Sequence, residues 1–109
     1  MAQFDIHRNK GPRSEAIPFV VLVQSSLFDR YRRRVVVPLV RRSALPGNTA
    51  MVGARMNPQF SVDSMEVVLH PLDMVSVALD QLGECIGSLS EQGQTITDAL
   101  DELFSRSWG

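Results

Sequence analysis

The feature that most constrains the fold is the contrast between the last twenty residues and the chain before them. Residues 90–109 carry one apolar stripe formed by Ile96, Ala99, Leu100, Leu103 and Phe104. These positions follow i, i+3, i+4, i+7 and i+8, so they line one face of a helix. Upstream, the chain has the patterns of strands and turns. We therefore expect a mainly β fold with one C-terminal α-helix.

Two apolar runs rich in β-branched residues predict buried strands. Residues 17–25 contain FVVLV, and residues 34–40 read RVVVPLV. Runs this short and this apolar are typical of strands covered on both faces. Pro38 has no backbone N–H, which predicts that the second strand lies at an edge, is bulged, or ends at this residue.

Shorter segments complete the predicted sheet. Residues 3–7 alternate apolar and polar side chains, as a half-buried strand does. Asp63 and Ser64 separate two further strand-like segments and predict a two-residue hairpin turn. Residues 72–82 predict another strand, after which Gly83 and Gly87 are expected to lead into the helix. Residues 43–58 show no steady period and predict a long irregular loop.

Length and composition predict one domain over residues 1–109. No apolar run approaches the length of about 18 residues needed for a membrane span, and the N-terminus lacks the apolar region of a signal peptide. We therefore predict a cytoplasmic protein without a membrane partner. Cys85 is the single cysteine, so it cannot form an internal disulfide. It is interpreted as a small, buried apolar residue.

The net charge of −1 conceals a strong asymmetry along the chain. Residues 1–55 carry ten basic and three acidic side chains, a net charge of +7. Residues 56–109 carry one basic and nine acidic side chains, a net charge of −8. Such a division suits self-association or separate partner surfaces of opposite sign.

Side chains capable of chemistry are scattered through the sequence. There is no Ser/His/Asp or Cys/His grouping, no glycine-rich phosphate loop and no cluster with metal-ligand spacing. His7 and His70 are interpreted as structural residues of strands. The sequence thus predicts no catalytic residue, no metal site and no cofactor.

Two stretches instead suggest contact with a partner. The connection at residues 25–31 carries Leu27 and Phe28, and exposed apolar residues in connections often bind something. The Arg run that follows is either an anion-binding or nucleic-acid-binding patch or a solvated loop. Trp108 is either a frayed tail, a residue packed at a dimer seam, or an aromatic anchor for a partner.

Several stretches follow one family pattern in a constant order. The firmest are VLVQSSLFD at residues 21–29 and RVVVPL at residues 34–39, where the family reads V-x-V-Q-S-x-L/I-x-D and R-x-V-I-P-L. The pattern starts at residues 3–4 (QF) and resumes at residues 74–77 (MVSV) and 82–90 (LGECIGSLS). It ends with Ile96, Ala99, Leu100 and Phe104, and only residues 44–57 align poorly. In these stretches the chain resembles the CcdB toxins of bacterial toxin–antitoxin modules, which poison DNA gyrase.

The resemblance implies an SH3-like twisted antiparallel barrel with a small wing sheet, closed by the C-terminal helix, in a symmetric homodimer. It also implies that the protein binds the gyrase A subunit and traps the complex with cleaved DNA, without chemistry of its own. The family residues that contact gyrase correspond here to Trp108, Gly109, Leu27, Phe28 and Asp101. The Trp-Gly pair comes three residues later than in the family pattern, and the Ile that ends the family pattern has no counterpart in this sequence. Asp101 stands where the family has a neutral amide.

A second implication is a CcdA-type antitoxin with a disordered, largely acidic tail that folds on the toxin. The predicted receptor for that tail is the basic run of Arg30, Arg32, Arg33 and Arg34. Toxin and antitoxin together would repress their own operon, with the antitoxin making the contacts to operator DNA.

Two alternatives stay open. An endoribonuclease of the MazF type shares this fold and would cut RNA with Arg and His side chains, for which His7, Arg8, Arg33 and His70 are candidates. A non-toxic homologue would only bind an antitoxin and buffer its concentration. Growth arrest on expression separates this last alternative from the two toxins.

Overall fold

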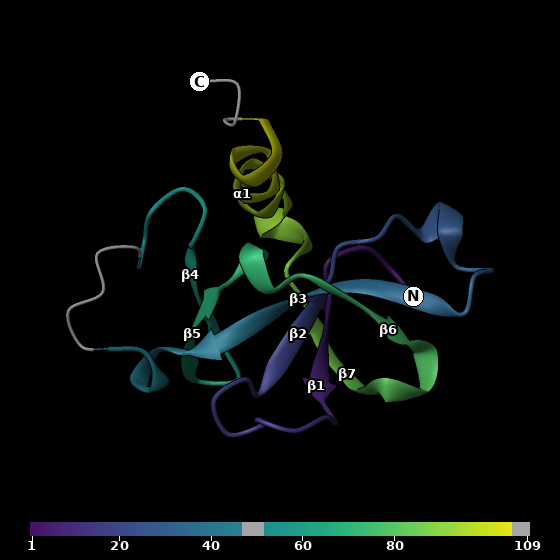
Figure 1. The fold of residues 1–109 in the computed structure, drawn as a ribbon, viewed down its shortest axis with the longest axis horizontal. Helices are drawn as coiled ribbons and strands as arrows, with labels where there is room; N and C mark the ends of the chain where they lie inside the picture. The colour runs from purple at the N-terminus through teal and green to yellow at the C-terminus, as the bar shows by residue number, and fades with distance from the viewer. Residues whose placement is uncertain (47–51, 106–109) are drawn as a thin grey trace.

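The computed structural model describes residues 1–46 and 52–105. In this part of the chain, an antiparallel sheet of seven strands curls around and is covered by one α-helix (Figure 1). The strands are β1 (Asp5–Asn9), β2 (Phe19–Leu22), β3 (Arg33–Arg41), β4 (Gln59–Val62), β5 (Met65–Leu69), β6 (Val75–Ala78) and β7 (Leu82–Ser88), and the helix is α1 (Gly93–Ser105). Short 3-10 helices connect them: η1 (Ser26–Phe28), η2 (Arg42–Ala44), η3 (Pro71–Asp73), η4 (Leu79–Gln81) and η5 (Ser90–Gln92).

The sheet runs in the order β4-β5-β3-β2-β1-β7, and β6 pairs separately with β3. β3 therefore has two different neighbours on the side away from β2. Its first part, residues 33–36, pairs with β6, and residues 39–41 pair with β5. The hairpin of β4 and β5, together with the end of β3, forms the smaller wing. The predicted fold class, a twisted antiparallel sheet with a wing and a C-terminal helix, is confirmed.

β3 continues through Pro38, although the sequence predicted an edge, a bulge or an end there. Pro38 lies opposite Val20 of β2, in the middle of the sheet. Its carbonyl accepts a hydrogen bond from the His70 N–H at 3.1 Å, which shows that its backbone polar groups face the connection between β5 and β6. The N–H that Pro38 lacks would point to the place where β3 changes its partner from β6 to β5. Its absence therefore removes no hydrogen bond from either strand pair.

The predicted hairpin turn at Asp63 and Ser64 is confirmed. Both residues have positive φ, 53° and 62°, as a two-residue type I′ turn requires. This turn sets the register in which Val62 pairs with Met65. In residues 45–46 and 52–58 the structure contains no strand, in agreement with the predicted irregular loop.

Gly83 and Gly87 lie within β7, and the prediction that they lead into the helix is wrong. The register between β1 and β7 shifts twice, on either side of the pair His7 and Cys85. At Gly83 an added Cβ would lie 2.6 Å from the Arg8 carbonyl oxygen. Only glycine allows the two backbones to approach this closely at the irregularity.

Cys85 is exposed, and the prediction that it is buried is wrong. β7 is an edge strand that pairs with β1 alone. An edge position gives Cys85 no second neighbouring strand to cover it. The prediction relied on the general preference of free cysteine for the protein interior, which does not hold at this position.

The core has two parts, one on each face of the sheet. Residues from most strands pack under α1 on one face: Ile6, Phe19, Val21, Val37, Leu39, Phe60, Val62, Val67, Leu69, Leu89, Ile96 and Ala99. On the other face Val20, Leu22 and Val36 pack with Val77 and Leu82. Successive residues of β2 thus enter opposite cores, which confirms that this strand is buried on both faces.

The predicted apolar stripe of α1 is confirmed at its start and leaves the core toward its end. Ile96 and Ala99 have no exposed surface, whereas Phe104 is 61% exposed. Before the helix, the Ser88 hydroxyl accepts a hydrogen bond from the Ser90 N–H at 3.0 Å, at the start of η5. Among the described residues, no helix has both the length and the apolar character needed to cross a membrane.

Candidate interaction surface

The connection between β2 and β3 forms an ordered loop that presents two large apolar side chains. It contains η1, which is preceded by Ser25 as its N-cap: the Ser25 hydroxyl accepts a hydrogen bond from the Leu27 N–H at 3.2 Å. Such a cap satisfies a backbone donor that the short helix leaves unpaired. Leu27 is 81% exposed and Phe28 is 50% exposed. The predicted partner-binding residues are therefore held at the surface by local hydrogen bonds.

Gln24 fixes both ends of the loop. Its amide nitrogen donates to the carbonyls of Phe28 and Arg33, each at 3.3 Å. Its amide oxygen accepts from the Val35 N–H at 2.9 Å. One side chain thereby connects the end of η1 to the start of β3.

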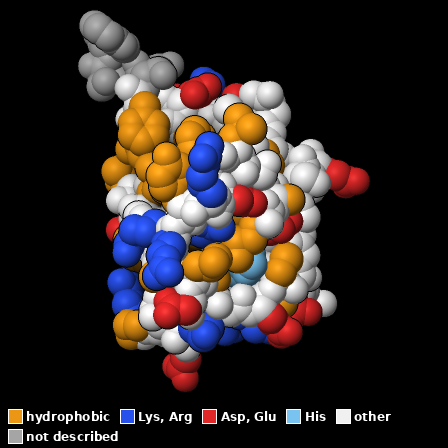
Figure 2. Space-filling view, turned by 90° about the vertical axis from the view of Figure 1, so that its right-hand side faces the viewer, with side chains coloured by type: hydrophobic (Ala, Val, Ile, Leu, Met, Phe, Trp, Pro, Cys, Tyr) orange, Lys and Arg blue, Asp and Glu red, His pale blue; other side chains and the backbone are white. Residues whose placement is uncertain are grey.

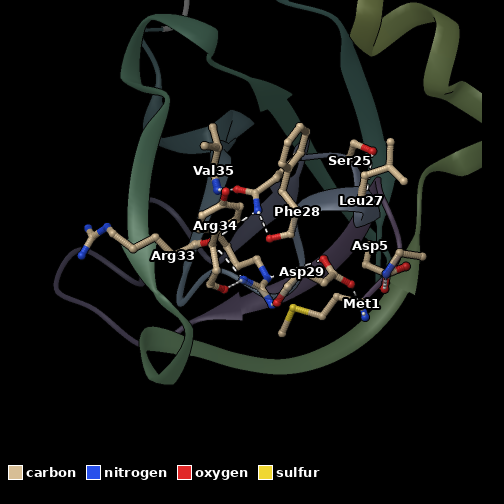
Figure 3. A network of polar contacts seen from close by, with 12 residues as sticks. Met1, Asp5, Ser25, Leu27, Phe28, Asp29, Arg33, Arg34 and Val35 are labelled. Atoms are coloured by element: carbon tan, nitrogen blue, oxygen red, sulfur yellow. Dashed lines mark hydrogen bonds and ion pairs between the residues drawn. The ribbon is translucent and has the colours of Figure 1, made fainter.

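Arg34 lies among the residues of the same loop and holds it by polar contacts (Figure 3). Its guanidinium donates to the carbonyls of Asp29 at 2.7 Å and Arg33 at 2.9 Å, and also to the carbonyl of Tyr31. The Asp29 carboxylate lies 3.8 Å from Nε of Arg34 and 3.2 Å from the N-terminal ammonium of Met1. Arg34 is only 4% exposed. Arg34 therefore lies buried beneath the loop and positions it, and its predicted part in an antitoxin receptor stays a prediction.

The other three arginines of the predicted receptor are exposed. Arg33 donates to the Ser76 hydroxyl at 2.8 Å and to the Ser76 carbonyl at 2.6 Å, so it is anchored to β6. Arg30 and Arg32 lie in the loop before β3. The run therefore presents up to three cationic groups beside the apolar residues of η1.

A shallow hollow of about 500 Å³ lies between these two kinds of side chain. Its lining is Gln24, Phe28, Tyr31, Arg32, Arg33 and Val35. The rings of Phe28 and Tyr31 lie 6.3 Å apart, centroid to centroid. Figure 2 shows hydrophobic side chains gathered on this side of the molecule with Lys and Arg side chains next to them. Tyr31 was not among the predicted site residues, although its place at the end of the connection at residues 25–31 could have indicated it.

The second part of the predicted gyrase-binding set belongs to α1. Asp101 is exposed on this helix, one turn before the exposed Phe104. In Figure 1, η1 and α1 both rise on the upper side of the sheet. Trp108 and Gly109 lie outside the described residues, and their predicted role stays a prediction.

The residues predicted for the ribonuclease alternative each have a different partner. His7 is buried and its Nδ1 lies 3.0 Å from the Gly83 carbonyl oxygen, while Arg8 binds Glu84 at 2.9 Å. Arg33 is bound to Ser76, and Nδ1 of His70 lies 3.0 Å from the Asp73 carboxylate. The four side chains come from β1, β3 and the residue after β5. Their contacts do not join them into one group.

A comparison with models of protein families gives a match for this chain. The family model described as CcdB protein matches residues 3–105. The match includes the loop, the Arg run and α1 within its bounds. Comparison with curated proteins gives no match.

Proposed function

Since the chain belongs to the CcdB family, and is thereby a toxin of the toxin–antitoxin type, we propose that it binds the DNA gyrase A subunit as a homodimer. In this proposal it traps the complex in which gyrase has cleaved DNA. The toxin makes and breaks no bond. It acts by binding one state of the gyrase cycle more tightly than the others and thus shifts the population toward that state.

The observation that carries the proposal is the exposed apolar pair Leu27 and Phe28 on a loop that Gln24 and Arg34 hold by hydrogen bonds. Large apolar side chains in water are unfavourable unless a partner covers them. A loop already fixed in one conformation also loses little entropy on binding. Together with Asp101, Trp108 and Gly109 on the C-terminal side, the pair would supply the contact with gyrase.

We also propose that a CcdA-type antitoxin binds the Arg run. A partly apolar hollow bordered by Arg32 and Arg33 suits a segment with alternating acidic and apolar side chains. Arg30 would add a third charge, whereas Arg34 would hold the loop. The antitoxin would neutralise the toxin, and the complex would repress the operon through the antitoxin's contacts with operator DNA.

The first experiment measures gyrase supercoiling and DNA cleavage with the purified full chain. A chain lacking Trp108 and Gly109 runs beside it, and an RNA substrate serves as a control. We expect trapped cleaved DNA with the full chain and none with the deletion, while the fold and the dimer stay intact. If gyrase is unaffected and the RNA is cut, the ribonuclease alternative is correct. No effect in either assay and no growth arrest would favour the antitoxin-binding homologue.

A pair of Leu→Ala variants tests the loop itself. Leu27→Ala removes an exposed side chain of η1 and should weaken gyrase binding about 10-fold or more, as loss of an interface anchor does. Leu79→Ala removes a partly exposed Leu of η4 and serves as the matched control. Equal effects of the two variants would contradict a specific contact by η1.

A further inference from the structure

β1 and β7 bring together three side chains of metal-binding type that are far apart in the sequence. Asp5 and His7 belong to β1, and Cys85 belongs to β7, which pairs with β1 (Figure 1). One carboxylate oxygen, one imidazole nitrogen and the thiol sulfur all lie within 4.8 Å of one another. The sequence predicted no metal site, because only strand pairing places Cys85 beside two residues near the N-terminus.

A β-bulge determines which side chain faces His7. The pair Ile6 and Gly87 would, in regular register, be followed by His7 opposite Ile86. Instead the register shifts, and Cys85 lies opposite His7. A second shift follows before Asn9. Bulges re-aim side chains and are frequent next to functional sites, so this one gives the cluster a structural cause.

The hydrogen bonding of His7 leaves one ring nitrogen for a metal ion. It is 4% exposed, and its Nδ1 lies 3.0 Å from the Gly83 carbonyl oxygen. A carbonyl can only accept, so in the neutral imidazole Nδ1 carries the hydrogen and Nε2 has the free lone pair. Nε2 is buried without a hydrogen-bond partner in the described part of the chain. A histidine whose ring N–H is held by a carbonyl, with the other nitrogen available, is the usual arrangement in metal sites.

Asp5 is also held in place. Its Oδ2 accepts a hydrogen bond from the Ala2 N–H at 3.0 Å. Carboxylates that bind metals are commonly fixed by such outer hydrogen bonds. The exposed thiol of Cys85, in contrast, makes only a weak contact of 3.5 Å with the Gly87 carbonyl oxygen. It is the ligand that is most easily moved.

We propose that Asp5, His7 and Cys85 bind a divalent metal ion of the Zn²⁺ class. One nitrogen, one sulfur and one oxygen donor suit this borderline-soft ion. In the tetrahedral geometry of Zn²⁺, bond lengths of about 2.0–2.3 Å place the ligand atoms roughly 3.3–3.8 Å apart. The three ligand atoms, which lie within 4.8 Å of one another, must therefore approach one another by about 1 Å. Rotation of the Cys85 and Asp5 side chains supplies this movement, and water takes the fourth position. The proposal does not depend on binding to gyrase.

Bound metal would stabilise the edge of the sheet from which the chain enters α1. The ion links β1 to β7 by ligand bonds as well as by the ladder. At a metal concentration about 100 times the Kd, the melting temperature should rise by roughly 10 °C. This shift provides a readout independent of toxicity.

The test titrates the full chain with Co²⁺ in a buffer with a non-chelating reductant. We expect one ion per chain, with the near-ultraviolet charge-transfer band of a thiolate bound to cobalt, and displacement of Co²⁺ by Zn²⁺. Cys85→Ala should abolish the band and leave the fold unchanged by circular dichroism, because Cys85 is exposed. Asp5→Asn should weaken Zn²⁺ binding at least about 10-fold.

His70→Gln is the matched control, since His70 and Asp73 form a His–carboxylate pair without a thiol. This variant should bind Co²⁺ as the unmodified chain does. The proposal is overturned if the folded, unmodified chain binds neither Co²⁺ nor Zn²⁺. It is equally overturned if Cys85→Ala retains the band or if His70→Gln loses it.

Discussion

Replacing the buried Arg34 by Ala should destabilise the protein and loosen the loop that presents Leu27. Arg34→Ala removes guanidinium hydrogen bonds to two loop carbonyls and to the Arg33 carbonyl at the start of β3, and also the ion pair with Asp29. A hydrogen bond to a charged group contributes about 1.5–3 kcal/mol, but these carbonyls lie in a surface loop and water replaces part of the loss. We expect a loss of about 3 kcal/mol in the free energy of unfolding.

Urea unfolding followed by circular dichroism measures this loss. Arg34→Lys keeps the charge but not the planar fork that reaches several carbonyls, so it should lose about 1–2 kcal/mol. Arg32→Ala is the matched control, because Arg32 is exposed in the same loop, and its effect should stay within about 0.5 kcal/mol. If Arg34→Ala is no more destabilising than Arg32→Ala, Arg34 does not hold the loop.

The same variant links stability to the proposed function. If Arg34 positions η1, the Leu27→Ala substitution should cost less gyrase affinity in the Arg34→Ala background than in the unmodified chain. A double-mutant cycle under conditions where both chains are folded measures this coupling. Full additivity of the two changes would refute the positioning role.

Three further predictions test the fold, two of them with a control substitution. Gly83→Ala places a Cβ 2.6 Å from the Arg8 carbonyl oxygen and should destabilise by about 2 kcal/mol or more, whereas Gly87→Ala, whose nearest atom is 4.0 Å away, should be close to neutral in the same urea titration. Ile96→Ala empties a site without exposed surface and should lower the free energy of unfolding by about 2–5 kcal/mol, with Ile96→Val at about 0.5–1.5 kcal/mol as the graded control. Asn57→Ala leaves the Leu69 carbonyl without its 3.1 Å donor and should cost about 1–3 kcal/mol, seen as a lower melting temperature; an unchanged value would show that water replaces the amide.

The amino-acid sequence by itself determined the elements whose signal is local. The apolar run of β2 predicted a strand buried on both faces, and the spacing of Ile96 and Ala99 predicted the face of α1 that meets the core. The turn at Asp63 and Ser64 was likewise readable, because a two-residue connection between strand-like segments permits few conformations. The family pattern, spread over the chain, matched the family that the comparison found.

The tertiary structure decided everything that depends on which strands become neighbours. Pro38 is tolerated in the middle of the sheet only because β3 changes partners there. Cys85 is exposed because β7 has one neighbour, and it faces His7 because of a bulge. Arg34 looks in the sequence like any other member of a basic run, yet it is buried under its own loop. Periodicity reports which face of an element is apolar, whereas register, bulges and edges arise from contacts between residues far apart in the chain, which no local pattern encodes.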